Sequence, residues 1–267
     1  MSNEGLVFYE KSHRYKLDGA WVPGVTTILG VLNKPALTKW AASQVAEYVA
    51  DHRDAITHLY AAGRGPMVAA LKETPWQKRD DAADRGTSLH DFAERLLRDE
   101  EVEVPEALAP VMEHAMRFLD EWKVEPLLIE AAVGSREHLY AGKLDLAAAY
   151  VNPVTGERGV GIFDWKSGKR IYASACFQLN AYGQAEFHGQ RGDEQPMADL
   201  GITAAFGVHI REDDYDVMPL RYGPDIYREF LTIRQTYDVN KRAEGNWRIE
   251  GSGYVGASIR EKEEVWA

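Results

Sequence analysis

The chain has 267 residues, of which 45% are hydrophobic, enough for one domain with a full buried core. Its 42 acidic and 31 basic residues give a formal net charge of −11, which excludes a uniformly basic surface for nucleic acid. Its single cysteine, Cys176, excludes an intrachain disulfide and a four-cysteine iron–sulfur cluster.

Residues 1–75 are expected to form an N-terminal hairpin followed by a helical region. The Asp18-Gly19 turn signal predicts a hairpin that ends at about Gly24. From Thr26 to about Trp122, apolar residues recur at helical spacing. Helix breaks are expected at Asn33-Lys34-Pro35, Gly63-Arg64-Gly65-Pro66 and Thr74-Pro75.

A helix with a candidate metal ligand, His90, belongs to the core segment at residues 76–190. Apolar side chains from Leu89 to Leu97 follow the helical period, and Gly86 precedes His90 by one turn on the same face. A glycine at this position would let the helix approach a sheet closely and would direct His90 toward the strand ends. The alternative is a surface or core histidine without a ligand role.

Asp145 stands in the middle of an apolar, alternating stretch, Leu139–Tyr150, which predicts a strand. Asn-Pro and Thr-Gly turn signals then predict a hairpin connection to a second strand that contains Asp164. The two acids would lie side by side on adjacent antiparallel strands. An acid inside an apolar strand is costly to bury unless it is paired or binds a metal. The alternative for Asp145 is a strand-end acid, or one that pairs with Lys143.

The second strand ends in Asp164-Trp165-Lys166, where the period of two puts Asp164 and Lys166 on one face and Trp165 on the other. A carboxylate that can hold a metal therefore lies beside a cation that can hold a nucleophile or an anionic transition state. On the preceding strand, Glu130 is a candidate ligand for a second metal. A strand-end carboxylate that is simply paired is the commoner case for such a residue.

Gln178 and Tyr182 lie four residues apart on the helix predicted for Tyr172–Phe187, so they share one helix face. Together they offer an amide and a hydroxyl group to a phosphate or a base edge, although an ordinary polar helix face is the alternative. Residues 191–267 predict two further strands, a helix and a tail. We expect a single domain over 1–267 of the α/β class, with a mixed central sheet flanked by helices and an N-terminal helical region.

Taken together, four motifs resemble those of RecB-like nucleases of the PD-(D/E)XK superfamily, in the same order. The resemblance covers about Asp80 to Phe187, and the segments Phe8–Tyr15 and Val22–Leu29 are similar to phage-type exonucleases of this group. Leu144 replaces the proline of the superfamily name, and Asp164 replaces a glutamate that many members have. The motifs run from Gly86 to His90, from Gly142 to Asp145, from Asp164 to Lys169 and from Gln178 to Tyr182.

The resemblance implies a restriction-endonuclease-like core that binds Mg²⁺ or Mn²⁺. It implies that Lys166 orients or activates the attacking water and neutralises charge on the scissile phosphate. The nucleic-acid strand would be positioned by Gln178, Tyr182 and Lys169. The metal ligands it implies are His90, Asp145, Asp164 and the main-chain carbonyl of Trp165.

We therefore expect a metal-dependent DNA exonuclease of phage or bacterial recombination and repair. Its substrate would be a linear DNA end or a single strand, and its partner, by analogy, a recombination or single-strand-annealing protein. The alternatives are a structure-specific or restriction-like endonuclease, and a non-catalytic nucleic-acid-binding module of the same fold. Because no run of 18 apolar residues and no apolar signal region occur, we expect no membrane contact and a cytoplasmic location in the bacterial or phage-infected cell.

Overall fold

The structure is a computed structural model that describes residues 5–32, 35–98, 100, 104–167 and 170–244. For residues 35–37, 77–88, 107 and 244 it describes the backbone alone. None of the described helices is long and apolar enough to cross a membrane.

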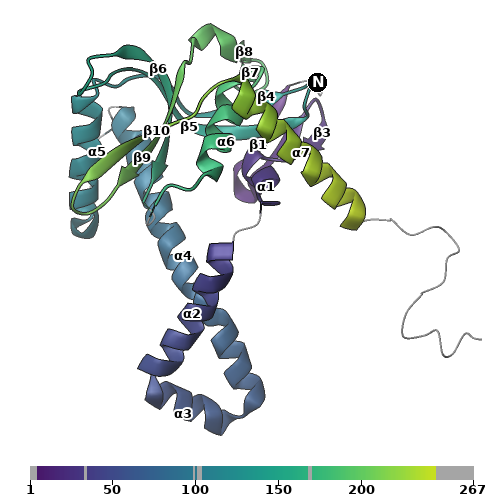
Figure 1. Cartoon of the computed structure of the whole chain (residues 1–267), viewed down its shortest axis with the longest axis vertical. Helices are drawn as coiled ribbons and strands as arrows, with labels where there is room; N and C mark the ends of the chain where they lie inside the picture. The colour runs from purple at the N-terminus through teal and green to yellow at the C-terminus, as the bar shows by residue number, and fades with distance from the viewer. Residues whose placement is uncertain (1–4, 33–34, 99, 101–103, 168–169, 245–267) are drawn as a thin grey trace, which may run out of the picture.

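A seven-stranded mixed sheet forms the centre of the molecule, in the order β10-β9-β6-β5-β4-β7-β8 (Figure 1). Strands β6 and β9 are parallel, and the other neighbouring pairs are antiparallel. Helices flank the sheet, so the expected α/β class is confirmed. The strands are β4 (Glu125–Ser135), β5 (Tyr140–Val151), β6 (Arg158–Lys166), β7 (Phe187–His188), β8 (Gln195–Pro196), β9 (Ala204–Ile210) and β10 (Tyr215–Leu220).

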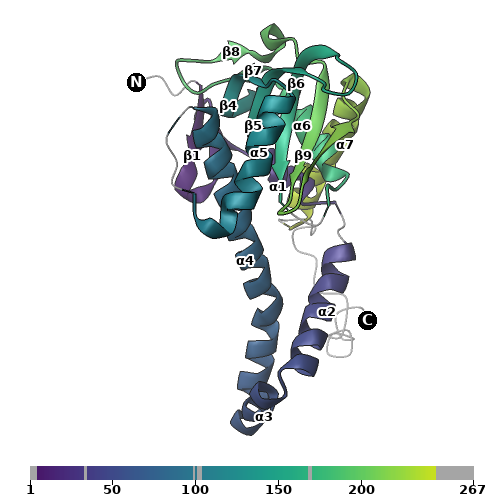
Figure 2. The ribbon, with the colours of Figure 1, turned by 90° about the vertical axis from the view of Figure 1, so that its left-hand side faces the viewer.

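Two groups of helices cover the two faces of this sheet (Figure 2). The end of α4 (Arg64–Leu97) and α5 (Ala109–Glu121) pack on one face, where Phe118 lies edge-on to the buried ring of Trp165. Helices α1 (Val25–Leu29), α6 (Ser174–Gly183) and α7 (Pro224–Glu244) pack on the other face. Short 3-10 turns complete the chain at Glu10–Ser12, Glu106–Leu108 and Met197–Leu200.

The predicted N-terminal hairpin is instead a three-stranded antiparallel sheet of β1 (Leu6–Tyr9), β2 (Arg14–Leu17) and β3 (Ala20–Val22). The Asp18-Gly19 turn joins β2 to β3, with φ of +49° and +81° at these two residues. The missed strand is β1, because a 3-10 turn separates it from β2 and no glycine marks that turn. A single bridge from Gly24 to Ala141 attaches this small sheet to β5.

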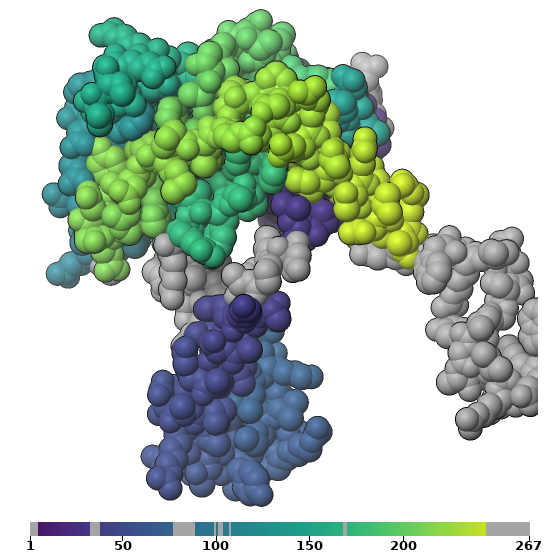
Figure 3. All heavy atoms as spheres, viewed as in Figure 1, coloured from purple at the N-terminus to yellow at the C-terminus, as the bar shows by residue number. Residues whose placement is uncertain are grey.

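An arm of three helices projects from the rest of the molecule (Figure 1; Figure 3). It consists of α2 (Pro35–Asp51), α3 (Arg53–Ala62) and the first half of α4. The chain turns at Gly63, as expected, whereas the break expected at Thr74-Pro75 is wrong because α4 continues through it. Thr74 and Pro75 are both buried in the arm, and this packing offsets the hydrogen bond that a proline removes from the helix.

Side chains of β5 should alternate between the two faces of the sheet, but this alternation is interrupted at Asp145. Leu144 belongs to the cluster under α6 and α7, whereas Leu146 belongs to the cluster under α4 and α5. Opposite Asp145 in the register of β4 and β5, Glu130 has a φ of +48°, in the left-handed region that residues other than glycine seldom adopt. The irregular backbone therefore occurs at the two acidic residues that face each other across these strands.

Candidate metal centre

Three side chains from three different elements bring possible ligand atoms within 4.8 Å of one another. They are His90 of α4, Glu130 of β4 and Asp145 of β5. The Nδ1 atom of His90 lies 3.5 Å from Asp145 Oδ2 and 3.9 Å from Glu130 Oε1. The histidine side chain is 32% exposed and the two carboxylates 12% and 10%, so the group opens to solvent on the side of His90.

Asp164 lies next to this group, on the strand beside Asp145. The ladder of β5 and β6 pairs Leu146 with Phe163, which makes Asp145 and Asp164 the next neighbours along the two strands and confirms their predicted adjacency. Asp164 is almost completely buried, and its Oδ1 atom accepts a hydrogen bond of 3.0 Å from Gln178 Nε2. Its Oδ2 atom makes no hydrogen bond with the described residues and is held by an ion pair with Lys166.

The backbone of Trp165 links the two acids. Its N–H donates a 2.9 Å hydrogen bond to Asp145 Oδ2. The N–H and C=O of one strand residue point to the same side, so the Trp165 carbonyl also faces the Asp145 side of β6. The Trp165 ring is buried in the opposite cluster, as strand alternation predicts.

Lys143 pairs with Glu130, not with Asp145, through a 2.6 Å contact between Nζ and Oε2. Glu130 is therefore both a paired carboxylate and a member of the ligand group. The left-handed backbone that brings Glu130 into the group cannot be read from the residue types. Lys143, expected only as a possible partner of Asp145, is a residue of the site through Glu130.

Electrostatic interactions in the group shift the pKa of its members. Burial would lower the pKa of His90, but its contact with Glu130 and the charges of Asp145 and Asp164 outweigh burial and raise the pKa to about 8. Burial, together with the charge of Asp164, raises the pKa of Asp145. Burial would also raise the pKa of Glu130, but His90 and Lys143 outweigh it and lower that pKa.

These residues fit a hard divalent cation. The site has three carboxylates and two ammonium groups, so its formal charge is −1 when His90 is neutral. The carboxylates are those of Glu130, Asp145 and Asp164, and the ammonium groups are those of Lys143 and Lys166. Carboxylate oxygens with one imidazole are suitable ligands for Mg²⁺ or Mn²⁺. The buried Oδ2 of Asp164, which pairs with Lys166 alone among the described residues, is a further ligand atom once the lysine gives way to a cation.

Cation affinity is expected to fall as the pH drops below about 8. His90 then carries a proton, Asp145 with its raised pKa begins to gain one, and a cation must displace both. The affinity should decrease about tenfold per pH unit for each displaced proton. Calorimetric titration of Mn²⁺ at about pH 6.5 and about pH 8.5, in buffers of different ionisation enthalpy, counts the released protons. Equal affinity at both values would contradict the shifted pKa values.

Tyr182 packs directly on Gly142, so two of the sequence motifs meet in space. A Cβ atom at Gly142 would overlap the ring of Tyr182. The Tyr182 hydroxyl also accepts a 3.4 Å hydrogen bond from Gln178 Nε2, which in turn holds Asp164. The glycine of the Gly142 motif is thus needed for the close approach of α6 to β5.

Gly142→Ala is expected to destabilise the protein by about 1–3 kcal/mol, because the added methyl group forces Tyr182 out of its packed position. Displaced Tyr182 should also loosen the contact of Gln178 with Asp164. Thermal unfolding followed by circular dichroism measures the first effect. The matched control is Gly65→Ala at the start of α4, where the added Cβ meets nothing beyond its own helix and stability should stay unchanged or rise slightly. Equal effects at both glycines would contradict the contact.

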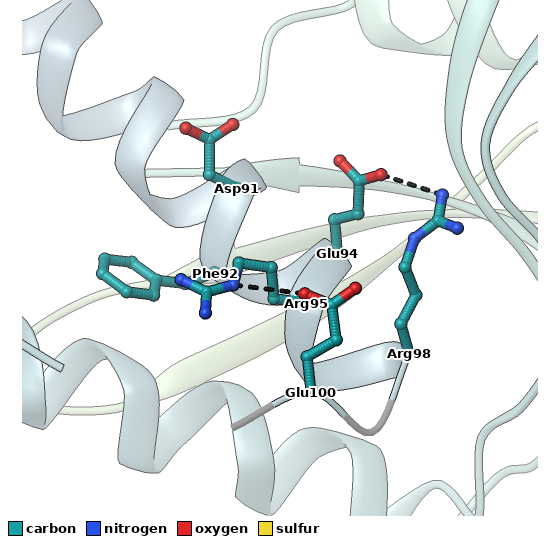
Figure 4. A pocket seen from close by; sticks show the side chains of 6 residues that line it. All are labelled: Asp91, Phe92, Glu94, Arg95, Arg98 and Glu100. Carbon is teal, nitrogen blue, oxygen red and sulfur yellow. Dashed lines mark hydrogen bonds and ion pairs between the residues drawn. The ribbon is translucent and has the colours of Figure 1, made fainter. Parts of the chain in front are cut away.

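Of the predicted site residues, the structure brings together His90, Asp145, Asp164, Lys166, Gln178 and Tyr182. Lys169 lies outside the described residues. A separate hollow at the end of α4 contains none of these side chains (Figure 4). Four of its five charged groups pair with one another, Glu94 with Arg98 at 2.8 Å and Arg95 with Glu100 at 3.3 Å. The hollow is lined by Asp91, Phe92, Glu94, Arg95, Arg98 and Glu100.

In comparisons with known proteins, no protein-family model and no curated protein sequence matches the chain.

Proposed function

We propose that the protein is a metal-dependent nuclease of the RecB-like type that degrades DNA from an end. The observation that carries the proposal is the ion pair between Lys166 and buried Asp164, which lies next to His90 and Asp145. A lysine beside an acidic group that can bind a cation suits phosphodiester hydrolysis, because both charges act on the same phosphate.

We assign the cation to His90, Asp145 and Asp164, with the Trp165 carbonyl as a further ligand. When bound, a divalent cation polarises the phosphoryl oxygen and lowers the pKa of a coordinated water. Glu130 faces the same Nδ1 atom of His90 as Asp145 does, but Lys143 neutralises it, so we do not assign it as a ligand.

Lys166 is placed to act on the substrate. Its side chain is 30% exposed, whereas that of Asp164 is 2% exposed, so the ammonium group lies on the solvent side of the acid. A phosphate that approaches the cation therefore meets Lys166, which stabilises the charge that develops on the phosphate oxygens and orients the attacking water. Gln178 and Tyr182 keep Asp164 in place and present their polar groups beside it.

The net charge of −11 favours local recognition of a strand over indiscriminate binding of duplex DNA. A non-catalytic module would not need the pairing of Lys166 with Asp164. A restriction-like enzyme would need a sequence-reading element, and the sequence contains no recognisable one. We therefore favour attack from an end, and we place the enzyme in recombination or repair, with a single-strand-annealing protein as a partner by analogy.

The decisive experiment compares end-labelled linear DNA with covalently closed circular DNA in the presence of Mg²⁺ or Mn²⁺. We expect the linear DNA to be degraded, the circle to stay intact, and chelation to abolish the reaction. Asp164→Asn should be inactive, whereas the control Asp120→Asn, at an exposed acid of α5, should match the wild type. Nicking of the circle would indicate an endonuclease, and no hydrolysis of any DNA would refute the proposal.

A further inference from the structure

The N-terminal sheet has an apolar face and an aromatic, cationic face. Its inner residues, Leu6, Tyr15 and Leu17, are buried in a cluster with Phe187 of β7. Strand alternation puts a different set on the outer face. We call this set, which consists of Tyr9, Arg14, Lys16 and Trp21, the Trp21 face.

The rings of this face are exposed and in contact with the cations. Trp21 is 48% and Tyr9 41% exposed, and their ring centroids lie 5.2 Å apart. The Arg14 guanidinium lies 3.9 Å and the Lys16 ammonium 4.8 Å from the centroid of the Trp21 ring. Neither cation forms an ion pair with a carboxylate in the described part of the chain, so their charges remain available to an anion.

The inner side of the same sheet, opposite the Trp21 face, lies next to the candidate metal centre. Phe8 precedes Tyr9 and stacks on Tyr15 at 4.9 Å. The ring of Phe8 lies 5.9 Å from the ammonium of Lys143, which pairs with Glu130. A chain of contacts on the inner side of the sheet therefore joins β1 to the ligand group, while the Trp21 face lies on the outer side.

We propose that the Trp21 face binds a single-stranded part of the nucleic-acid substrate, an inference that rests on the proposed nuclease function. Bases would stack on Trp21 and Tyr9, and phosphates would pair with Arg14 and Lys16. Exposed rings beside unpaired cations provide both contacts that a single strand requires. Duplex DNA keeps its base faces stacked inside the helix, so it offers no face to these rings.

The charge of the Trp21 face, which differs from that of the whole chain, also favours nucleic acid as its ligand. The chain carries 42 acidic residues, yet the Trp21 face has two cations and no acid. On binding, a base takes the place of Arg14 on the Trp21 ring, and the released guanidinium pairs with the neighbouring phosphate. The face therefore supplies the local positive potential that the overall composition lacks.

The test measures binding of a short fluorescein-labelled oligothymidylate by fluorescence anisotropy, with the metal chelated so that no hydrolysis occurs. Trp21→Ala is expected to weaken binding about tenfold, because one stacking ring is lost. Trp21→Phe should retain most of the affinity. Arg14→Ala with Lys16→Ala should reduce the dependence of affinity on salt by about two phosphate contacts. The control is Tyr60→Ala, which removes an exposed ring from the arm and should change nothing.

The outcomes separate this inference from the proposed function. If the wild type degrades DNA while Trp21→Ala and the double variant bind the oligonucleotide normally, the inference is wrong and the nuclease proposal stands. If the wild type binds the oligonucleotide through Trp21 but hydrolyses no DNA, the face is a binding site and the nuclease proposal fails. If Trp21→Ala weakens the binding of blunt duplex DNA as much as that of the single strand, the proposed preference for single strands is wrong. Thermal unfolding of each variant checks that it is folded under the conditions of the binding measurement.

Discussion

Lys166→Ala is expected to lower the rate of DNA hydrolysis at least about a hundredfold while cation binding persists. The ammonium group pairs with Asp164 and lies on its solvent side, so its loss removes the charge that faces the phosphate and leaves the carboxylates in place. Because the cation no longer competes with a lysine for Asp164, Mn²⁺ should bind as tightly as in the wild type or more tightly. Single-turnover hydrolysis and Mn²⁺ calorimetry measure the two effects separately.

The control is Lys123→Ala, which removes a lysine from an exposed ion pair with Asp120 and should leave the rate unchanged. If Lys166→Ala lost cation binding together with activity, Lys166 would be a structural residue of the site. If it retained full activity, the proposed role of Lys166 would be wrong.

Asp145→Asn is expected to stabilise the metal-free protein and to abolish stabilisation by Mn²⁺. Burial and the neighbouring Asp164 raise the pKa of Asp145, which means that above this pKa the ionised carboxylate destabilises the folded state. Asparagine is uncharged, and its side-chain oxygen can still accept the hydrogen bond from the N–H of Trp165. At about pH 8.5 we expect the unfolding temperature without metal to rise by about 2–4 °C, which corresponds to about 1 kcal/mol.

With Mn²⁺ at about a hundred times its dissociation constant, the wild type should gain about 2.7 kcal/mol and Asp145→Asn much less. Differential scanning calorimetry with and without chelator gives both values. Asp216→Asn, at an exposed acid of β10, is the control and should retain the full Mn²⁺ shift. A variant that is less stable without metal and still stabilised by Mn²⁺ would show that Asp145 is a structural acid.

The central strands could be predicted from the sequence because their signals are local. Alternation put Asp164 and Lys166 on one face, and the structure pairs them. The turn signals after Val151 predicted a hairpin, and this hairpin places Asp145 beside Asp164. Both inferences need only the period of a strand and the position of a turn.

Other features depend on tertiary packing and could not be read from residue types. The left-handed backbone at Glu130 reverses the alternation opposite Asp145, and it brings Glu130 to His90 and Lys143. Simple alternation along β4 would put Ile129 and Ala131, the two neighbours of Glu130, on the same face, whereas they pack on opposite faces. Pro75 likewise predicted a helix break, whereas α4 is continuous and buries Thr74 and Pro75 in the arm.

The arm has a direct structural connection to the site, because α4 extends from Gly63 at the far end of the arm to His90. This continuity gives the N-terminal helical region a place next to the chemistry, although the sequence motifs begin only at Gly86.

The most direct test of the account is the position of Mn²⁺ in crystals of the protein, determined by anomalous diffraction. The account predicts a peak bound by the imidazole of His90 and the carboxylates of Asp145 and Asp164, with Lys166 turned away from Asp164. A peak bound by His90, Glu130 and Asp145 without Asp164, or the absence of a peak at these residues at saturating Mn²⁺, would contradict it.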